Sequence, residues 1–123
     1  MHKSYKSSLF ALLAAAAFAT GAHADDLGKK TFETCVACHS MKAGENGTGP
    51  TLHKLIGRQA GSVEGFRFSG PMKRSGIVWN AETLSAFLRA PQESVPGNRM
   101  PYSGTTDEAA LKALVAYLEA ESR

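Results

Sequence analysis

The sequence predicts an all-α fold with three principal helices, and three observations support this prediction. Apolar residues recur at helical spacing in three segments, near residues 27–36, 80–91 and 105–120. The connecting segments are rich in glycine and proline and contain no convincing pair of strands. The chain has 123 residues and no internal repeat, so we expect a single small domain.

Residues 1–24 have the organisation of a cleaved secretory signal peptide. Lys3 and Lys6 supply positive charge, residues 9–19 form an apolar run, and Ala22-His23-Ala24 fits a small-residue cleavage site. The run is shorter than the about 20 residues of a membrane-spanning helix, and an uncleaved anchor is the alternative. We therefore expect one periplasmic domain, residues 25–123, with no transmembrane anchor after cleavage.

Composition narrows the classes of function. Losing Lys3 and Lys6 would leave a nearly neutral chain without a basic tail, so nucleic-acid binding is not implied. A domain of this size buries only roughly 60–65% of its unfolded surface, and a large apolar cofactor would supply the core that the sequence lacks.

The first predicted helix starts at Asp25 and Asp26, which can cap it, and runs through Leu27 and Phe32 to Val36. A glycine inside it, Gly28, costs about 1 kcal/mol relative to alanine. Such a glycine is useful where a second helix approaches closely.

Loops fill the middle of the chain. Residues 40–49 are interrupted by three glycines, and residues 65–71 alternate aromatic and small residues over too short a stretch to build a sheet. Asn80 can cap the second helix, and Pro91 prevents its continuation. Its apolar face consists of Leu84, Phe87 and Leu88.

The last part of the chain is predicted to be an extended loop followed by a helix. Residues 92–104 contain two prolines and two glycines, which favour the loop. Thr105 and Glu108 fit a capping box, from which the third helix would run to about Ala120.

The pattern Cys35-Val36-Ala37-Cys38-His39 is the C-x-x-C-H signature of covalent c-type haem attachment. Each cysteine sulfur can form a thioether with a vinyl group of the porphyrin, and His39 would then reach the iron. Three alternatives are weaker. A thioredoxin-like pair needs a preceding strand, a zinc site needs four ligands, and a disulfide across so short a loop stabilises little.

A second axial ligand is expected on the other side of the iron, and methionine sulfur is a common choice in electron carriers. Met100 lies on a loop that can reach that side, whereas Met41 is too close to His39 and Met72 is expected to pack against the ring. His53 is a nitrogen alternative. The carbonyl of Pro50 is a candidate acceptor for the second ring N–H of His39.

The ordered motifs resemble those of class I cytochromes c, of the mitochondrial and bacterial c2 type, over almost all of residues 27–120. Besides the haem motif, the matching segments are residues 28–32, 48–53, 57–58, 75–79, 96–100 and the last helix. The resemblance implies a small cytochrome c fold wrapped around one covalently attached haem.

The resemblance also implies residue roles. Gly28 and Phe32 would pack against Leu114 and Tyr117, and Met100 would be the sixth ligand. Contacts to a haem propionate would come from Arg58 and Trp79. The chain departs from the family at Phe87 and Phe68, where tyrosines are common, and at Gln92 and Glu93, where lysines are common.

The function implied is that of a soluble, monomeric one-electron carrier rather than an enzyme. Expected partners are redox proteins: a quinol-oxidising complex, a terminal oxidase, a photosynthetic centre or a periplasmic dehydrogenase. An electron-accepting subunit of a dehydrogenase and a small haem peroxidase are the alternatives.

Overall fold

The computed structural model describes residues 11, 14–15 and 20–123, and these residues form helices and loops without a strand. The three longer helices are α1 (Thr20–Phe32), α3 (Ala81–Arg89) and α5 (Glu108–Glu121), and the two short ones are α2 (Gly70–Arg74) and α4 (Pro91–Ser94). The prediction of an all-α fold with three principal helices is confirmed. Most of the predicted signal peptide lies outside the described residues.

Helix α1 differs from the prediction at both ends. It begins at Thr20, so Asp25 and Asp26 lie inside it and do not cap it. The residues that precede them include alanines, the best helix formers, and no proline interrupts them. The helix ends at Phe32, after which the backbone N–H of Cys35 donates to the Phe32 carbonyl in a tight turn. Val36 therefore lies beyond the helix, where it is 59% exposed.

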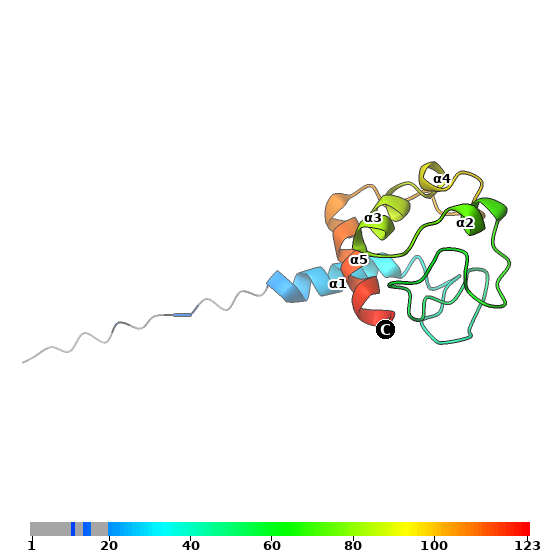
Figure 1. The fold of residues 1–123 in the computed structure, drawn as a ribbon. Coiled ribbons are helices and arrows are strands. Elements are labelled where there is room, and N and C mark those ends of the chain that lie inside the picture. Colours follow the sequence, from blue (N-terminus) through cyan, green and yellow to red (C-terminus); the bar gives the residue numbers. More distant parts are fainter. Residues whose placement is uncertain (1–10, 12–13, 16–19) are drawn as a thin grey trace, which may run out of the picture.

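Helices α1 and α5, which come from opposite ends of the sequence, cross in close contact (Figure 1). A Cβ atom at Gly28 would lie 2.5 Å from the carbonyl oxygen of Ala113 and 2.9 Å from Cβ of Tyr117. The rings of Phe32 and Tyr117 pack beside this crossing, with centroids 5.2 Å apart. Leu114 is completely buried in the same core. The packing expected of these residues is present.

Helix α3 is capped as predicted. The side-chain oxygen of Asn80 accepts from the Thr83 N–H at 2.9 Å, and the Thr83 hydroxyl accepts from the Asn80 N–H at 2.9 Å. The helix ends at Arg89, but Pro91 starts the short helix α4 instead of an extended loop. Proline suits the first helical position because its fixed φ is helical and its missing N–H would have no partner there.

The predicted capping box of α5 is wrong. The side chain of Asp107, not Thr105, accepts from the backbone N–H of Ala110 at 2.8 Å. Glu108 is the first helical residue and so does not occupy the third position that a capping box requires; its carboxylate forms two 3.1 Å hydrogen bonds with the guanidinium of Arg89. This exposed pair links α3 to α5, which extends to Glu121.

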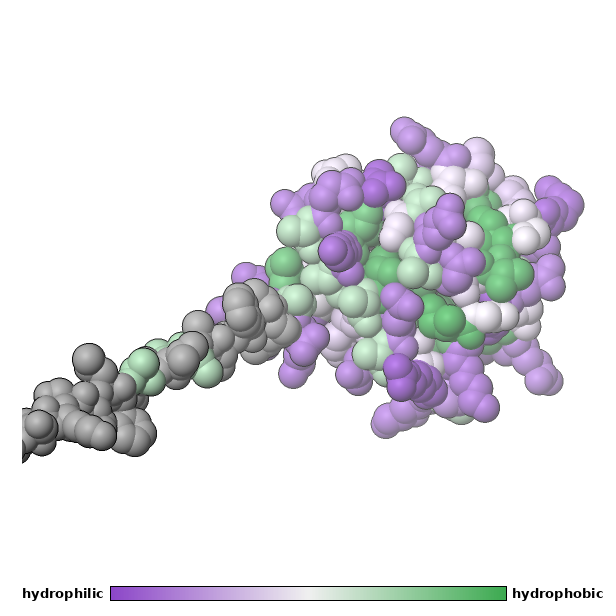
Figure 2. Space-filling model, turned by 60° about the vertical axis from the view of Figure 1, so that its left-hand side comes forward, coloured by the Kyte–Doolittle hydropathy of each residue, from purple (hydrophilic) through white to green (hydrophobic). Residues whose placement is uncertain are grey.

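The hydrophobic core gathers where α1, α3 and α5 meet the loops. Figure 2 shows that hydrophilic residues cover much of the surface on one side, with hydrophobic residues visible between them. Within the described residues, no helix is both long enough and apolar enough to cross a membrane.

The contact at Gly28 gives a stability prediction. We expect Gly28→Val to lower the free energy of unfolding by about 1–3 kcal/mol, because the new side chain would meet backbone atoms of α5 that cannot move aside freely. Ala120→Leu is the control, since it adds a larger side chain at an exposed position of α5 and should change stability by less than about 0.5 kcal/mol. Denaturant unfolding of both variants is the measurement, and equal changes would contradict the role of Gly28.

Candidate functional site

A cavity of about 320 Å³ lies between the helices and the loops of residues 34–69 and 99–102. This volume is within the range of ligand-binding pockets. One wall consists of core residues from the helices, among them Leu84, Phe87 and Leu114. Among the described residues that line it, every charged one is an arginine: Arg58, Arg67 and Arg99.

Four residues that the sequence singled out line this one cavity: Cys35, Cys38, His39 and Met100. The two cysteines are free thiols and partly buried. Burial raises the pKa of Cys35, a hydrogen bond from Thr34 acts in the opposite direction, and the proximity of Cys38 raises it further. Two thiols, an imidazole and a thioether thus face one largely apolar space.

The imidazole of His39 is oriented by Pro50. Its Nδ1 lies 2.7 Å from the Pro50 carbonyl oxygen. Because a carbonyl can only accept, Nδ1 carries the proton and Nε2 keeps its lone pair. Burial lowers the pKa of His39, the Pro50 hydrogen bond acts in the opposite direction, and the charge of Arg58 lowers it further. Burial and the nearby charge therefore favour the neutral form of the ring, which is the form that binds metals.

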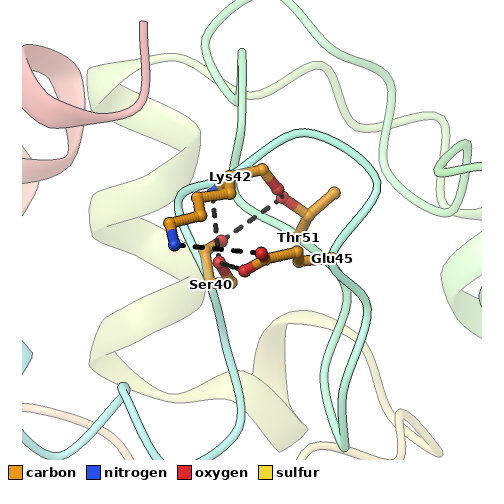
Figure 3. Close-up of polar contacts among 4 residues, drawn as sticks. All are labelled: Ser40, Lys42, Glu45 and Thr51. Carbon is orange, nitrogen blue, oxygen red and sulfur yellow. Dashed lines mark hydrogen bonds and ion pairs between the residues drawn. The ribbon is translucent and has the colours of Figure 1, made fainter.

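The loop that carries Pro50 is fixed by a small polar network around Thr51 (Figure 3). The Thr51 hydroxyl, in a residue that is 6% exposed, donates to the Lys42 carbonyl at 2.6 Å. The Ser40 hydroxyl donates to Glu45 at 2.7 Å and accepts from the Lys42 backbone N–H at 3.1 Å. These bonds close the loop on itself and hold the Pro50 carbonyl against His39.

Gly49 completes this side of the site. A Cβ atom there would lie 2.5 Å from Cε1 of His39, so any larger residue would push the imidazole away. The adjacent Thr51 backbone N–H donates to the side chain of Asn46, which in turn donates to the Glu64 carbonyl at 3.0 Å. The histidine loop is thereby joined to the next loop of the cavity wall.

Arg58, Trp79 and Phe87 also line the cavity. The Arg58 guanidinium donates to the carbonyls of His53 and Thr51, at 2.8 and 2.9 Å, and burial lowers its pKa without removing its charge. The rings of Trp79 and Phe87 are buried and pack with centroids 5.1 Å apart.

Of the other side chains considered as a second iron ligand, one lines the cavity and two do not. Met72 lies on α2, is buried and lines the same cavity as Met100. Met41 and His53 are not among the residues that line it. The cavity therefore brings together two of the three methionines considered.

The alternative interpretations of residues 35–39 find no support in the described part of the chain. A helix, not a strand, precedes Cys35, and the two thiols are not joined. No three His, Cys, Asp or Glu side chains of the described residues form a group that could hold a metal ion.

Comparison with known proteins assigns the family. The sequence profile of the family described as Cytochrome c matches residues 26–121. This chain belongs to the cytochrome c family.

Several cytochromes are similar in sequence to most of this chain. Cytochrome c2 iso-2 of Magnetospirillum fulvum is 44% identical over 88 residues, which cover 72% of this chain and 92% of the relative. Cytochrome c2 of Blastochloris viridis is 38% identical over 114 residues, covering 90% of each chain. The solved structure of cytochrome cH from Methylobacterium extorquens superposes with a TM-score of 0.73 at 36% identity, covering 78% of this chain and 97% of that one. The small cytochrome c fold expected from the resemblance is confirmed.

Membership of the family implies covalently attached haem c with its iron, electron transport and redox protein partners. The residues present fit this cofactor. The cavity is largely apolar, its wall offers two free thiols, an imidazole and thioether sulfurs, and its only charges among the described lining residues are arginines, which complement the haem carboxylates.

Several residues that shape the site were not found from the sequence. Gly49, Thr51 and Asn46 hold the histidine loop, and Arg67 contributes to the cavity wall. The glycines in residues 40–49 indicate a loop, but they do not indicate which side chains of the loop turn inward.

The Thr51 network gives a second stability prediction. We expect Thr51→Val, which keeps the shape but removes the hydroxyl, to lower the free energy of unfolding of the haem-loaded protein by about 1–3 kcal/mol, because the carbonyl oxygens of Ser40 and Lys42 lose their donor. Thr106→Val is the control: its side chain is exposed, and the expected change is below about 0.5 kcal/mol. Denaturant titration compares the two, and a loss no larger for Thr51→Val than for Thr106→Val would refute the role of the network.

Proposed function

We propose that this cytochrome c is a soluble periplasmic one-electron carrier in which Cys35 and Cys38 hold haem through thioethers and His39 and Met100 are the axial ligands. The observation that carries the proposal is the convergence of these four side chains on one largely apolar cavity. The haem iron, when bound, supplies one-electron chemistry between its ferric and ferrous states.

On the histidine side, the chain supplies a prepared ligand. The Pro50 carbonyl fixes the tautomer of His39, so that Nε2 is the nitrogen available to the iron. A hydrogen bond from the second ring nitrogen to a carbonyl also raises the basicity of a ligating imidazole. Arg58 and Trp79 are the proposed neighbours of a haem propionate, and Phe87 is a packing neighbour.

On the opposite side, the ligand is assigned to Met100 rather than Met72. Both methionines line the cavity, but Met72 is 9% exposed and held inside α2, where it serves the core. Met100 belongs to a loop, and it stands in the segment of residues 96–100 that matches the family motif. Its assignment is testable independently of the other residues.

With both axial positions filled, the protein has no coordination position for a substrate, and its role is to transfer electrons without making or breaking substrate bonds. The partners are then redox complexes met briefly, with an interface at the small end of the range for protein contacts. Gln92 and Glu93 are exposed where the family often has lysines, so these positions add no positive charge to a docking surface.

The ligand assignment predicts an absorption signature. The ferric protein should show the weak sulfur-to-iron charge-transfer band of a methionine-ligated, low-spin haem, and Met100→Ala should abolish it. Met72→Leu is the matched control, because it removes the other sulfur from the cavity wall and should leave the band in place. If the band survives Met100→Ala, the assignment of Met100 is wrong.

Export predicts a defined mature protein. In a bacterial host with haem-attachment machinery, the periplasmic fraction should contain a form that starts at Asp25 and carries one haem, as determined by intact-protein mass spectrometry. Replacing Ala22 and Ala24 with bulky residues should block processing, since the cleavage site requires small side chains. A haem-loaded protein that retains residues 1–24 in the membrane fraction would instead indicate an anchor.

A further inference from the structure

The side chain of Asn98, two residues before Met100, is almost fully enclosed. The residue is 7% exposed, and its amide nitrogen donates to the carbonyls of Pro91 and Val95, both at 2.9 Å. Its amide oxygen accepts from the backbone N–H of Met100 at 2.9 Å. Both amide hydrogens and the oxygen are therefore used, in bonds that connect α4 directly to the backbone of Met100.

Gln92, a residue of α4, adds a second connection between this helix and the loop that carries Met100. Its side chain donates to the Asn98 carbonyl at 2.9 Å and accepts from the Gly97 N–H at 3.3 Å. Gly97 has a φ of +82°, and a Cβ atom there would lie 3.1 Å from Cγ of Pro71. The segment of residues 97–100 is thus bonded to α4 and packed against α2, and substitution of Gly97 would be strained.

This arrangement compensates for a weakness of methionine as a ligand. The side chain of Met100 is unbranched, has three rotatable bonds and carries no charge. The side chain alone therefore does little to hold its sulfur in one position. A ligand from the same chain competes with an external ligand through its effective concentration, which increases when its backbone is fixed in place. The backbone of Met100 is fixed through the Asn98 amide.

We propose that Asn98 is a positioning residue for the Met100 ligand: its amide fixes the loop on α4 and so opposes displacement of the sulfur from the iron by external ligands. This inference rests on the proposed function, because it requires Met100 to be the ligand. It predicts that the strength of the methionine ligation depends on an amide that is not among the residues lining the cavity.

The test is a spectroscopic titration of the ferric, haem-loaded protein with imidazole, an external nitrogen ligand that displaces a thioether. We expect Asn98→Ala to bind imidazole about tenfold more tightly than the unsubstituted protein, equivalent to about 1.4 kcal/mol. Gln92→Ala should shift the affinity in the same direction by a smaller factor, because Gln92 is exposed and its loss leaves the Asn98 side-chain bonds in place. If Asn98→Ala fails to fold, the Gln92→Ala and Asn98→Asp proteins decide the question, since the carboxylate cannot donate to Pro91 and Val95.

Asn80→Ala is the matched control. It also removes an asparagine side chain that bonds to backbone, at the cap of α3, and it should lower the melting temperature without changing the affinity for imidazole. Equal increases in affinity for Asn80→Ala and Asn98→Ala would overturn the proposal, because the effect would then follow general stability. An Asn98→Ala affinity within about twofold of the unsubstituted protein would also overturn it.

The ligand role of Met100 and the positioning role of Asn98 can be refuted separately. If Met100→Ala keeps the charge-transfer band, the ligand assignment falls and the role of Asn98 falls with it. If Met100→Ala loses the band but Asn98→Ala leaves the imidazole affinity unchanged, the ligand assignment stands and only the positioning role is refuted.

Discussion

Leu84, Phe87 and Leu114 belong both to the buried core and to the wall of the cavity. This small chain must therefore pack its helices against one another and still keep a space between the helices and the loops. Protein interiors are normally filled to the density of organic crystals, and a wall without atoms on one side loses dispersion contacts. A covalent haem supplies those missing contacts. The cofactor is therefore part of the core, and the loops on the far side of the cavity are ordered mainly by what they enclose and by their own polar networks.

Those polar networks are placed on both sides of the cavity and are built differently. On the histidine side, Thr51 closes a loop that presents a carbonyl to His39, so the ring itself is the group that is held. On the methionine side, Asn98 holds the backbone of Met100 rather than its side chain. This difference follows from chemistry, because an imidazole has a second nitrogen that can be bonded, whereas a thioether has no donor and is only a weak acceptor.

The three principal helices, the cap at Asn80 and the group of residues around the cavity could be predicted from the sequence, because local periodicity and a five-residue motif carry that information. The start of α1 could not be predicted in this way. Asp25 fits a helix cap, but the alanine-containing segment before Asp25 is also helical. Thr105 matched a capping box, yet α5 begins at Glu108 and the residue directly before it, Asp107, is the cap. The supporting polar residues of the loops were missed since their partners are backbone groups, which leave no pattern in the sequence.

The crossing of α1 and α5 at Gly28 has a consequence for folding. It joins the first and last helices, so residues 33–107 form one closed loop that contains the rest of the cavity wall. Closing a loop of this length costs little more entropy than closing one of half the length, because the cost grows only with the logarithm of the number of residues. Contacts so distant in sequence nevertheless form slowly. The loop that carries the cavity is therefore anchored at its two ends by a contact between helices that lie outside it.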